Sequence, residues 1–169
     1  MVNSFIKDGE DVYAEGINGA QLFMAASTPK ITMVLPTDYD AGNFLSGEQK
    51  VAFVLVNVTL GTGTSIASNK LTLTGSTGTI NVRVYPNLEP FKSWLNMTWT
   101  ATTPGASSVT CKLYKNFGVT LVDASYTNGE DMSGKGLGLE YLDFQFTLTA
   151  DGTNKPTINT LTLQFTGGL

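Results

Sequence analysis

Apolar and polar residues alternate strictly in two segments of the second half of the chain. Residues 142–149 carry an apolar side chain at every even position, and residues 161–165 carry one at every odd position. A period of two places successive side chains on opposite faces, so each segment predicts a strand with one buried and one solvated face. A shift of one residue would expose Phe144 and Phe146, so the pattern also specifies the register.

The first half of the chain shows weaker strand patterns. Ile31–Leu35 predicts a short strand, and Lys50–Leu60 is apolar on both faces, which predicts one central strand buried on both sides. Two further alternating runs, Leu71–Leu73 and Ile80–Val84, flank Gly75–Gly78, and this spacing predicts a hairpin. No segment keeps a helical period. We therefore predict an all-β fold in which antiparallel sheets stack as a β-sandwich or jelly roll.

A domain boundary is expected where Pro86 and Pro90 interrupt the strand pattern. The prediction is a β-rich N-terminal region at residues 1–88, serving assembly or docking, followed by a jelly-roll-like β-sandwich at residues 89–169. The N-terminal region either forms its own small sandwich or contributes to assembly. Residues 1–28 are acidic and lack a strong periodicity, so they are either an extended arm that orders on a partner subunit or a frayed terminus.

The composition excludes several kinds of chemistry. The chain has no histidine, which removes the Ser-His-Asp triad, the Cys-His dyad and every histidine-ligated metal site. Its single cysteine, Cys111, shares a predicted inner face with Val109 and Leu113, so we expect a buried and inert thiol. The net charge of −4 comes with no run of Lys or Arg, which argues against nucleic acid and against an anionic membrane surface.

Neither an enzyme nor a secretory signal is expected from the sequence. A glycosidase with paired carboxylates is the remaining enzyme class, but Asp143 faces away from the predicted core, and Glu89, Glu130 and Glu140 fall at loops or strand ends. The sequence brings no two of these acids together. The first 15 residues lack a positive segment followed by an apolar one, so no signal peptide is predicted.

The C-terminal half carries a succession of turn and core motifs. They are Ser93-Trp94, Thr98–Pro104, Ser107–Thr110, Asp131–Lys135, Leu142–Thr149, Lys155–Ile158 and Leu161–Phe165. This succession, which covers roughly residues 90–169, resembles the jelly-roll, galactose-binding-like modules of structural proteins from tailed bacteriophages. Such modules often carry a longer Asp-Gly-Trp hairpin where this chain has Tyr114–Gly118 without a tryptophan.

The resemblance implies a non-enzymatic structural component of a tailed-bacteriophage particle, namely a decoration, fibre or tail/baseplate protein. Such a protein is located in the virion, after assembly in the host cytoplasm. It acts by self-association as a homo-oligomer and by docking onto other virion proteins. Unpaired edge strands give the means for both contacts, because they pair with neighbouring subunits. A further alternative is a tail-tube-type protein, which assembles into closed rings.

A carbohydrate-binding module that recognises a host-surface glycan is an alternative from a different class. Trp94 lies at a strand entrance, and four tyrosines lie on predicted polar faces or loops. These residues are candidate contacts to a glycan or a protein partner: Trp94, Tyr85, Tyr114, Tyr126 and Tyr141. The hypothesis requires them to converge on one exposed patch. Otherwise Trp94 packs at the edge of the core, as Trp99 is expected to pack within it.

A calcium site is the one cofactor hypothesis that the sequence offers. Asp38, Asp40 and Asn43 bring side-chain oxygens together in a Gly-containing turn, and calcium takes six to eight oxygen ligands. The spacing departs from the EF-hand loop. The alternative is a surface Asx turn, in which these side chains hydrogen-bond the local backbone.

Overall fold

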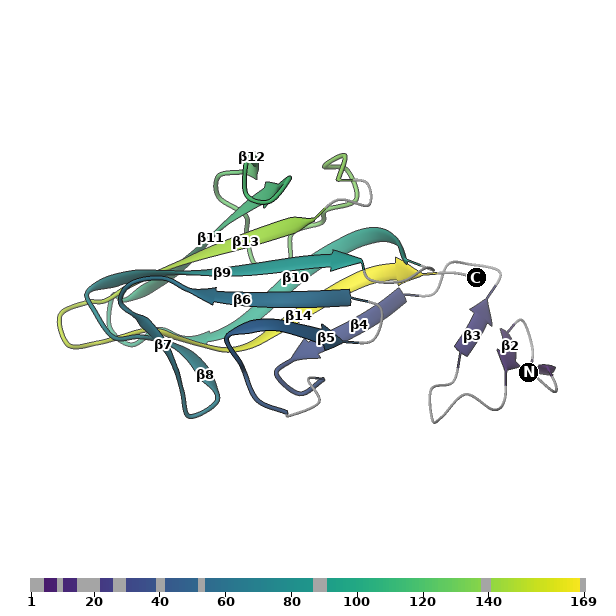
Figure 1. The fold of residues 1–169 in the computed structure, drawn as a ribbon, viewed down its shortest axis with the longest axis horizontal. Coiled ribbons are helices and arrows are strands. Elements are labelled where there is room, and N and C mark those ends of the chain that lie inside the picture. The colour runs from purple at the N-terminus through teal and green to yellow at the C-terminus, as the bar shows by residue number, and fades with distance from the viewer. Residues whose placement is uncertain are drawn as a thin grey trace.

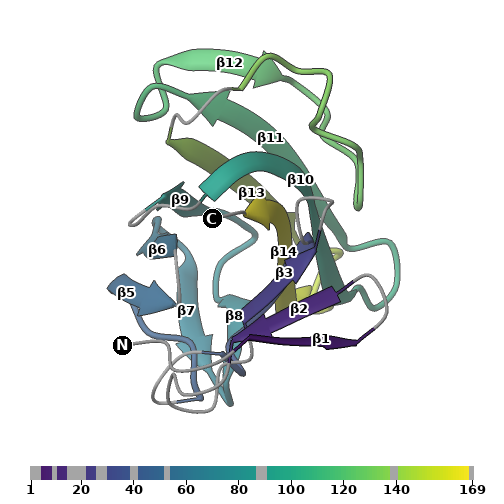
Figure 2. The ribbon, with the colours of Figure 1, turned by 90° about the vertical axis from the view of Figure 1, so that its right-hand side faces the viewer.

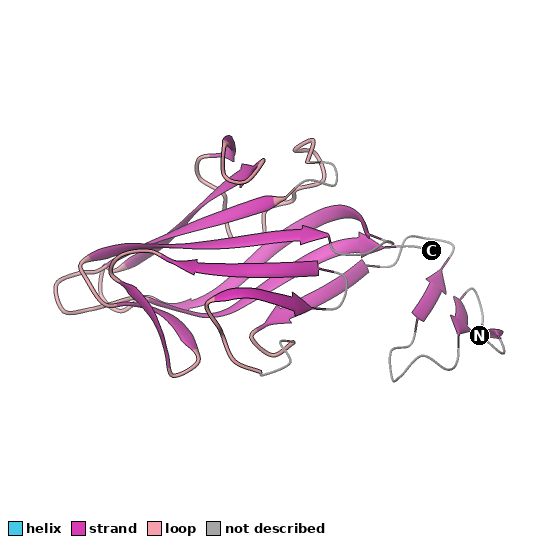
Figure 3. Cartoon of the chain, in the orientation of Figure 1, coloured by secondary structure: helices cyan, strands magenta, loops and turns pink. Residues whose placement is uncertain are grey.

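The computed structural model describes residues 5–8, 11–14, 22–25, 30–38, 42–51, 54–86, 91–137 and 141–167. Strands and loops account for all of them (Figure 3), which confirms the predicted all-β fold. Within these ranges, no helix has the length and apolar character needed to cross a membrane.

Two antiparallel sheets form a β-sandwich (Figure 1). The six-stranded sheet has the order β12-β11-β13-β9-β6-β5, and its strands are β5 (Gly47–Val51), β6 (Val54–Leu60), β9 (Thr77–Pro86), β11 (Ser108–Lys115), β12 (Thr120–Asp123) and β13 (Leu142–Thr149). The five-stranded sheet has the order β10-β14-β8-β7, with β4 also paired to β14, and its strands are β4 (Lys30–Leu35), β7 (Thr64–Ala67), β8 (Lys70–Leu73), β10 (Phe91–Thr102) and β14 (Thr157–Gly167).

One hydrophobic core lies between the two sheets, which form two layers when viewed along the strands (Figure 2). The apolar positions of β13 and β14 that alternate in the sequence all point into this core. Phe144 and Phe146 of β13 are fully buried, and Leu161 and Leu163 of β14 face them from the opposite sheet. The period-two pattern therefore gave the correct inner face for both strands.

The expected boundary at residue 88 does not divide the sandwich. β4 pairs with β14, and β9 lies between β13 and β6, so strands from both sides of residue 88 share both sheets and one core. Pro86 ends β9, but the chain then continues in the other sheet instead of entering a second unit. Residues 30–86 thus contribute to the same sandwich as residues 91–167.

The N-terminal segment contains a small sheet of its own. β1 (Phe5–Asp8), β2 (Asp11–Ala14) and β3 (Leu22–Ala25) pair in that order, and both pairings are antiparallel. The expected extended arm at residues 1–28 is therefore wrong for these strands, which pair with each other. Whether the segment orders on a partner subunit stays a prediction.

Two predicted elements of the first half are wrong in their connections. Lys50–Leu60 is split between β5 and β6, because Val51 pairs with Val54 in an antiparallel hairpin. The run holds no Gly, Pro or Asn-Gly pair at that point to signal a turn. Gly75–Gly78 does not close a hairpin either, because β8 and β9 belong to different sheets.

A loop closes the outer edge of β10. We call residues 126–132 the β10 strap, since they bond to the side of β10 that faces away from β14. The bonds join Gly129 N–H to Met97 O (3.0 Å), Met132 N–H to Leu95 O (2.7 Å), the Asn128 amide N–H to Trp99 O (2.7 Å) and Trp99 N–H to Asn128 Oδ1 (2.9 Å). The Asn128 side chain thereby substitutes for a backbone partner. An edge satisfied in this way offers little to another strand.

Candidate functional site

Trp94 lies in the core, so its predicted role as an exposed sugar contact is wrong. Its side chain is 2% exposed, and its ring centroid lies 4.3 Å from that of Phe91 and 6.4 Å from that of Phe165. Register shifts on both sides of Trp94 cause the difference from the sequence pattern, because each β-bulge changes which residues face inward. As a result β10 pairs three residues with core residues of β14, namely Trp94, Met97 and the half-buried Trp99.

Tyr126 is also buried, at 2% exposed, and it holds the β10 strap on β10. Its hydroxyl accepts a hydrogen bond from Met97 N–H (2.9 Å) and donates one to Glu130 O (2.8 Å). Burial raises the pKa of the Tyr126 hydroxyl above its ordinary value, so the group remains protonated and able to donate. The prediction that Tyr126 forms part of a binding surface is wrong, because a buried phenol cannot contact a partner.

Tyr114 and Tyr141 lie on the outer face of the six-stranded sheet, where both are half-buried. They do not converge with Trp94 and Tyr126, which lie on the core side. The glycan site as the sequence suggested it is therefore not assembled. Tyr141 belongs instead to a different group of residues on that outer face.

The calcium candidates are only partly within the described residues. One carboxylate oxygen of Asp38 accepts a hydrogen bond from Val34 N–H at 2.5 Å, and Asp38 N–H donates to Val34 O at 2.8 Å. Both bonds run back to Val34, four residues earlier, and so differ from the Asx turn that was the alternative, in which the side chain bonds the backbone two residues further on. Asn43 is described, whereas Asp40 lies outside the described residues. In the described parts of the chain, no three acidic or cysteine side chains gather as a metal site. The calcium site stays a prediction.

A polar and aromatic group occupies the outer face of the six-stranded sheet. Strand pairing places Tyr114, Asp143, Arg83, Asn57 and Glu48 in one row across β11, β13, β9, β6 and β5. Aromatic side chains from β9 and two loops flank this row. We call the following residues the outer-face cluster: Glu48, Asn57, Arg83, Tyr85, Phe117, Tyr141 and Asp143.

An ion pair lies at the base of the outer-face cluster. Arg83 Nε donates to Asp143 Oδ1 at 2.8 Å, and the Asn81 side-chain amide donates to the same oxygen at 2.8 Å. Asp143 was expected on a solvated face, yet it is only 1% exposed. The turn after β11 covers the Asp143 carboxylate. Gly118 of this turn lies so close that a Cβ atom added to it would be 3.8 Å from Asp143 Oδ2. That second oxygen is buried and has no hydrogen-bond partner among the described residues.

Phe117 covers the ion pair from an unusual backbone conformation. Asn116, Phe117 and Gly118 all have positive φ, at 53°, 58° and 81°. A large side chain such as Phe rarely adopts this region, which costs of order 1–3 kcal/mol. The Phe117 ring packs on Tyr141 at 4.3 Å between centroids, and the Arg83 guanidinium lies 5.0 Å from the ring centre. Even so, Phe117 is 58% exposed, so the turn presents an aromatic face to solvent.

A shallow hollow lies beside the Phe117 ring. Its walls are Glu48, Asn57, Arg83, Tyr85, Phe117 and Tyr141, and its volume is about 200 Å³. Tyr85 continues the aromatic wall, with its ring 4.8 Å from that of Tyr141, and its hydroxyl donates to the Glu48 carboxylate. Of this group, Tyr85 and Tyr141 were the candidate contacts expected from the sequence. The exposed aromatic residue in the turn, Phe117, was the signal that was missed.

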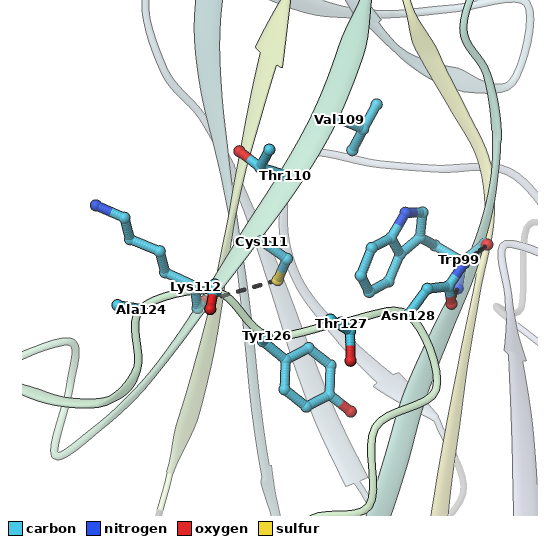
Figure 4. Close-up of a pocket in the computed structure, with 10 residues that line it drawn as sticks. Trp99, Val109, Thr110, Cys111, Lys112, Ala124, Tyr126, Thr127 and Asn128 are labelled. Atoms are coloured by element: carbon cyan, nitrogen blue, oxygen red, sulfur yellow. Dashed lines mark hydrogen bonds between the residues drawn. The ribbon is translucent and has the colours of Figure 1, made fainter.

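A second hollow, of about 460 Å³, opens between β10 and β11 (Figure 4). Figure 4 shows the Trp99 indole, the Cys111 thiol and the Tyr126 ring around one space. Cys111 is buried as expected, and burial together with the nearby charge of Asp123 raises the pKa of its thiol. A protonated thiol is a poor nucleophile, and no general base lines the hollow. The hollow offers apolar contact through Trp99, Val109 and Tyr126.

No protein-family model, curated protein or solved structure matches the chain. The resemblance to bacteriophage modules therefore remains a prediction from the motifs. The features that bear on function are the strand edges, the exposed apolar residues and the outer-face cluster.

An ion-pair group anchors the β10 strap to the end of β12. Lys135 Nζ lies 2.6 Å from Asp123 Oδ2 and 2.6 Å from Glu130 Oε1. The hydrogen bond from Lys135 is the largest cause that lowers the pKa of both carboxyl groups, and the bond to Asp123 is the largest cause that raises the pKa of Lys135. The Lys135 ammonium group therefore joins two carboxylates of like charge, one at the end of β12 and one in the β10 strap.

Acid is expected to release the β10 strap before it unfolds the sandwich. In the unfolded chain the pKa is about 3.9 for Asp and about 4.3 for Glu, and at any pH above these values both charged carboxylates stabilise the strap. This contribution is lost as the pH falls through the lower pKa values that the two groups have in the folded protein. The raised pKa of Lys135 reflects the same two ion pairs, so its contribution is present at neutral pH and is lost together with the carboxylate charges. Hydrogen-exchange protection factors at Gly129 and Met132 should therefore fall below about pH 4, while those in β13 persist. Equal loss at both places would contradict this expectation.

Proposed function

We propose that the protein is a non-enzymatic structural component of a tailed-bacteriophage particle, namely a decoration, fibre or tail/baseplate protein. It works by self-association and by docking onto other virion proteins. The jelly-roll connectivity, the virion location and the assembly in the host cytoplasm that the sequence resemblance implies are parts of this proposal. Its support from the geometry comes from one edge of the six-stranded sheet.

Exposed apolar side chains gather at the hairpin that ends in β12, and this is the observation that carries the proposal. Phe117 is 58% exposed, Val119 is 82% exposed and Leu121 is 50% exposed. All three lie within five residues on one edge of the sheet. Large apolar side chains that are clustered rather than scattered indicate a surface that another protein covers.

An unpaired strand edge lies at the same place. The β10 edge is closed by the β10 strap, whereas β12, like β5 and β7, pairs on one side only among the described strands, and of these three only β12 lies beside the cluster of exposed apolar side chains. A second copy that adds its own β12 would extend the sheet through backbone hydrogen bonds and would bury Leu121 in the same step. Many copies of such a modest contact give a particle high avidity.

The test is the mass of the purified protein in solution, measured by light scattering after size exclusion at tens of micromolar. We expect an oligomer for the wild type and a monomer for Leu121→Lys, because a charge at the edge blocks burial and pairing. Leu45→Lys is the matched control, since Leu45 is also exposed but lies before β5, at the opposite edge of the sheet. It should keep the wild-type mass.

Two outcomes would count against the proposal. A wild-type protein that remains monomeric would remove self-association, and an oligomer that persists in Leu121→Lys would remove β12 as its interface. Closed rings in electron micrographs would favour the tail-tube alternative over a decoration or fibre protein. Repeating the mass measurement with and without added calcium also tests the calcium prediction at Asp38, Asp40 and Asn43.

A further inference from the structure

We propose that the outer-face cluster binds a neutral saccharide ring. The proposal goes beyond a structural role and does not rest on self-association. It keeps Tyr85 and Tyr141 among the aromatic residues that the sequence suggested, but not Trp94 and Tyr126, which are buried. Three features support it: the aromatic wall, the polar groups beside it and the size of the hollow.

The aromatic wall is held in place at a cost. Phe117 would avoid its positive φ of 58° in a relaxed turn, yet packing on Tyr141 and on the Arg83 guanidinium keeps the ring above the sheet. Backbone strain of this kind is found most often where a protein holds a residue for a ligand. An exposed, fixed aromatic ring stacks well on the flat C–H face of a sugar, because little side-chain freedom remains to be lost.

Hydrogen-bond donors and a hydrogen-bond acceptor lie next to the aromatic wall. The terminal NH₂ groups of Arg83 and the side-chain NH₂ of Asn57 have no acceptor among the described residues, although the other atoms of both side chains are bonded. The Glu48 carboxylate accepts from the Tyr85 hydroxyl and has further lone pairs to offer. Sugar hydroxyls both donate and accept, so one ring satisfies all three side chains.

The charges in the cluster select among polar ligands. Arg83 carries one positive charge, and Asp143 and Glu48 carry one negative charge each, which leaves the cluster with a net charge of −1. An anionic sugar or a phosphate would meet the Glu48 carboxylate, while an ammonium ligand would meet the Arg83 guanidinium. A neutral ligand with many hydroxyl groups avoids both repulsions.

The hollow limits the size of the ligand and the strength of binding. Its volume of about 200 Å³ is smaller than the 300–1,000 Å³ typical of pockets for drug-sized molecules, so it suits a single ring. A shallow site of this kind gives a dissociation constant on the order of 1 mM for one ring. Repeated copies in an assembly would raise the avidity for a glycan-coated surface.

The experiment is a two-dimensional amide NMR titration of the full chain with methyl glycosides of neutral hexoses. We expect millimolar binding by at least one of them, with shifts at Phe117, Arg83 and Glu48. Sialic acid and choline serve as the anionic and cationic comparisons, and each should bind at least about tenfold more weakly. Saturation-transfer measurements on the bound sugar should show contact with aromatic protons.

Two glycine variants separate the role of the ring from the role of the turn. Phe117→Gly removes the aromatic wall and relieves the positive φ, so it should stay folded and lose at least about tenfold in affinity. Asn116→Gly relieves the strain at the neighbouring residue, whose φ is 53°, but keeps the ring, so it should bind like the wild type. Leu121→Lys should also bind normally, because it alters only the β12 edge.

Three results would overturn the proposal. One is the absence of shifts with every neutral glycoside at tens of millimolar. Another is unchanged affinity in Phe117→Gly, which would place the sugar elsewhere on the protein. A third is binding of sialic acid or choline as strong as that of the neutral sugars, which would contradict the argument from charge. Phe117 also belongs to the exposed edge proposed for self-association, so each titration is repeated on Leu121→Lys, which is expected to be monomeric and keeps the ring. Sugar binding by that variant is measured apart from oligomerisation, so this proposal and the structural role fail separately.

Discussion

Replacing Arg83 by methionine is expected to lower the free energy of unfolding by about 3 kcal/mol. The variant keeps most of the side-chain volume but leaves the Asp143 carboxylate, which is 1% exposed, without its cation. Removing one partner of a buried ion pair typically costs about 3–5 kcal/mol. We expect the lower end because Asn81 still donates to Asp143 Oδ1 and because Arg83 is itself 30% exposed. Denaturant unfolding at neutral pH measures the change.

A double variant tests whether the loss comes from the buried charge. Arg83→Met combined with Asp143→Leu removes both charges and should recover most of the lost stability, since replacing a whole ion pair by apolar residues is often neutral. Lys112→Met is the matched control, because Lys112 is an exposed cation on β11 of the same sheet, and its change should stay within about 0.5 kcal/mol. If Arg83→Met behaves like Lys112→Met, Asp143 is solvated rather than buried.

The environment of Asp143 shows what a local pattern leaves out. Alternation along β13 correctly places Asp143 on the face opposite Phe144 and Phe146. It does not say what covers that face, because the cover is a turn about 25 residues earlier in the chain. The turn lies over Asp143 owing to three successive positive φ angles, and among those residues Asn116 and Gly118 are common choices there, whereas Phe117 is not.

The strand β10 shows a second limit of pattern analysis. Its buried residues Phe91, Trp94 and Met97 are three apart, which a period of two cannot predict. β-bulges produce this spacing, and they depend on pairing with β14, about 70 residues later. The sequence therefore identified the strand but left two roles open for Trp94, and its burial agrees with packing at the core rather than with a sugar contact. It also missed the β10 strap, whose bonds to β10 include an asparagine side chain.

The parts of the fold that were predicted share a physical basis. β13, β14 and the Cys111 position of β11 lie in long, regularly paired strands, in which side-chain direction follows from the backbone alone. The outer-face cluster could not be predicted in the same way, because its seven residues come from four strands and two loops. Their proximity depends on strand order, and single-sequence periodicity carries no information about strand order.

Replacing Trp94 by alanine is expected to cost about 3–5 kcal/mol of unfolding free energy. The indole is among the largest fully buried side chains, and its loss leaves a cavity between Phe91 and Phe165. Trp99→Ala should cost clearly less, because Trp99 is only partly buried at the rim of the core. Denaturant unfolding of both variants, with unchanged β-sheet circular dichroism before the transition, measures the difference.

A second substitution at Trp94 separates packing from hydrogen bonding. The Trp94 Nε1 is buried and has no acceptor among the described residues, so Trp94→Phe removes an unsatisfied donor while it loses part of the ring volume. These effects oppose each other, and we expect a net loss below about 1.5 kcal/mol. A loss as large as that of Trp94→Ala would mean that the indole N–H has a partner in solution. A negligible loss in Trp94→Ala would place Trp94 at the surface, where the sugar-contact hypothesis for this residue would regain its basis.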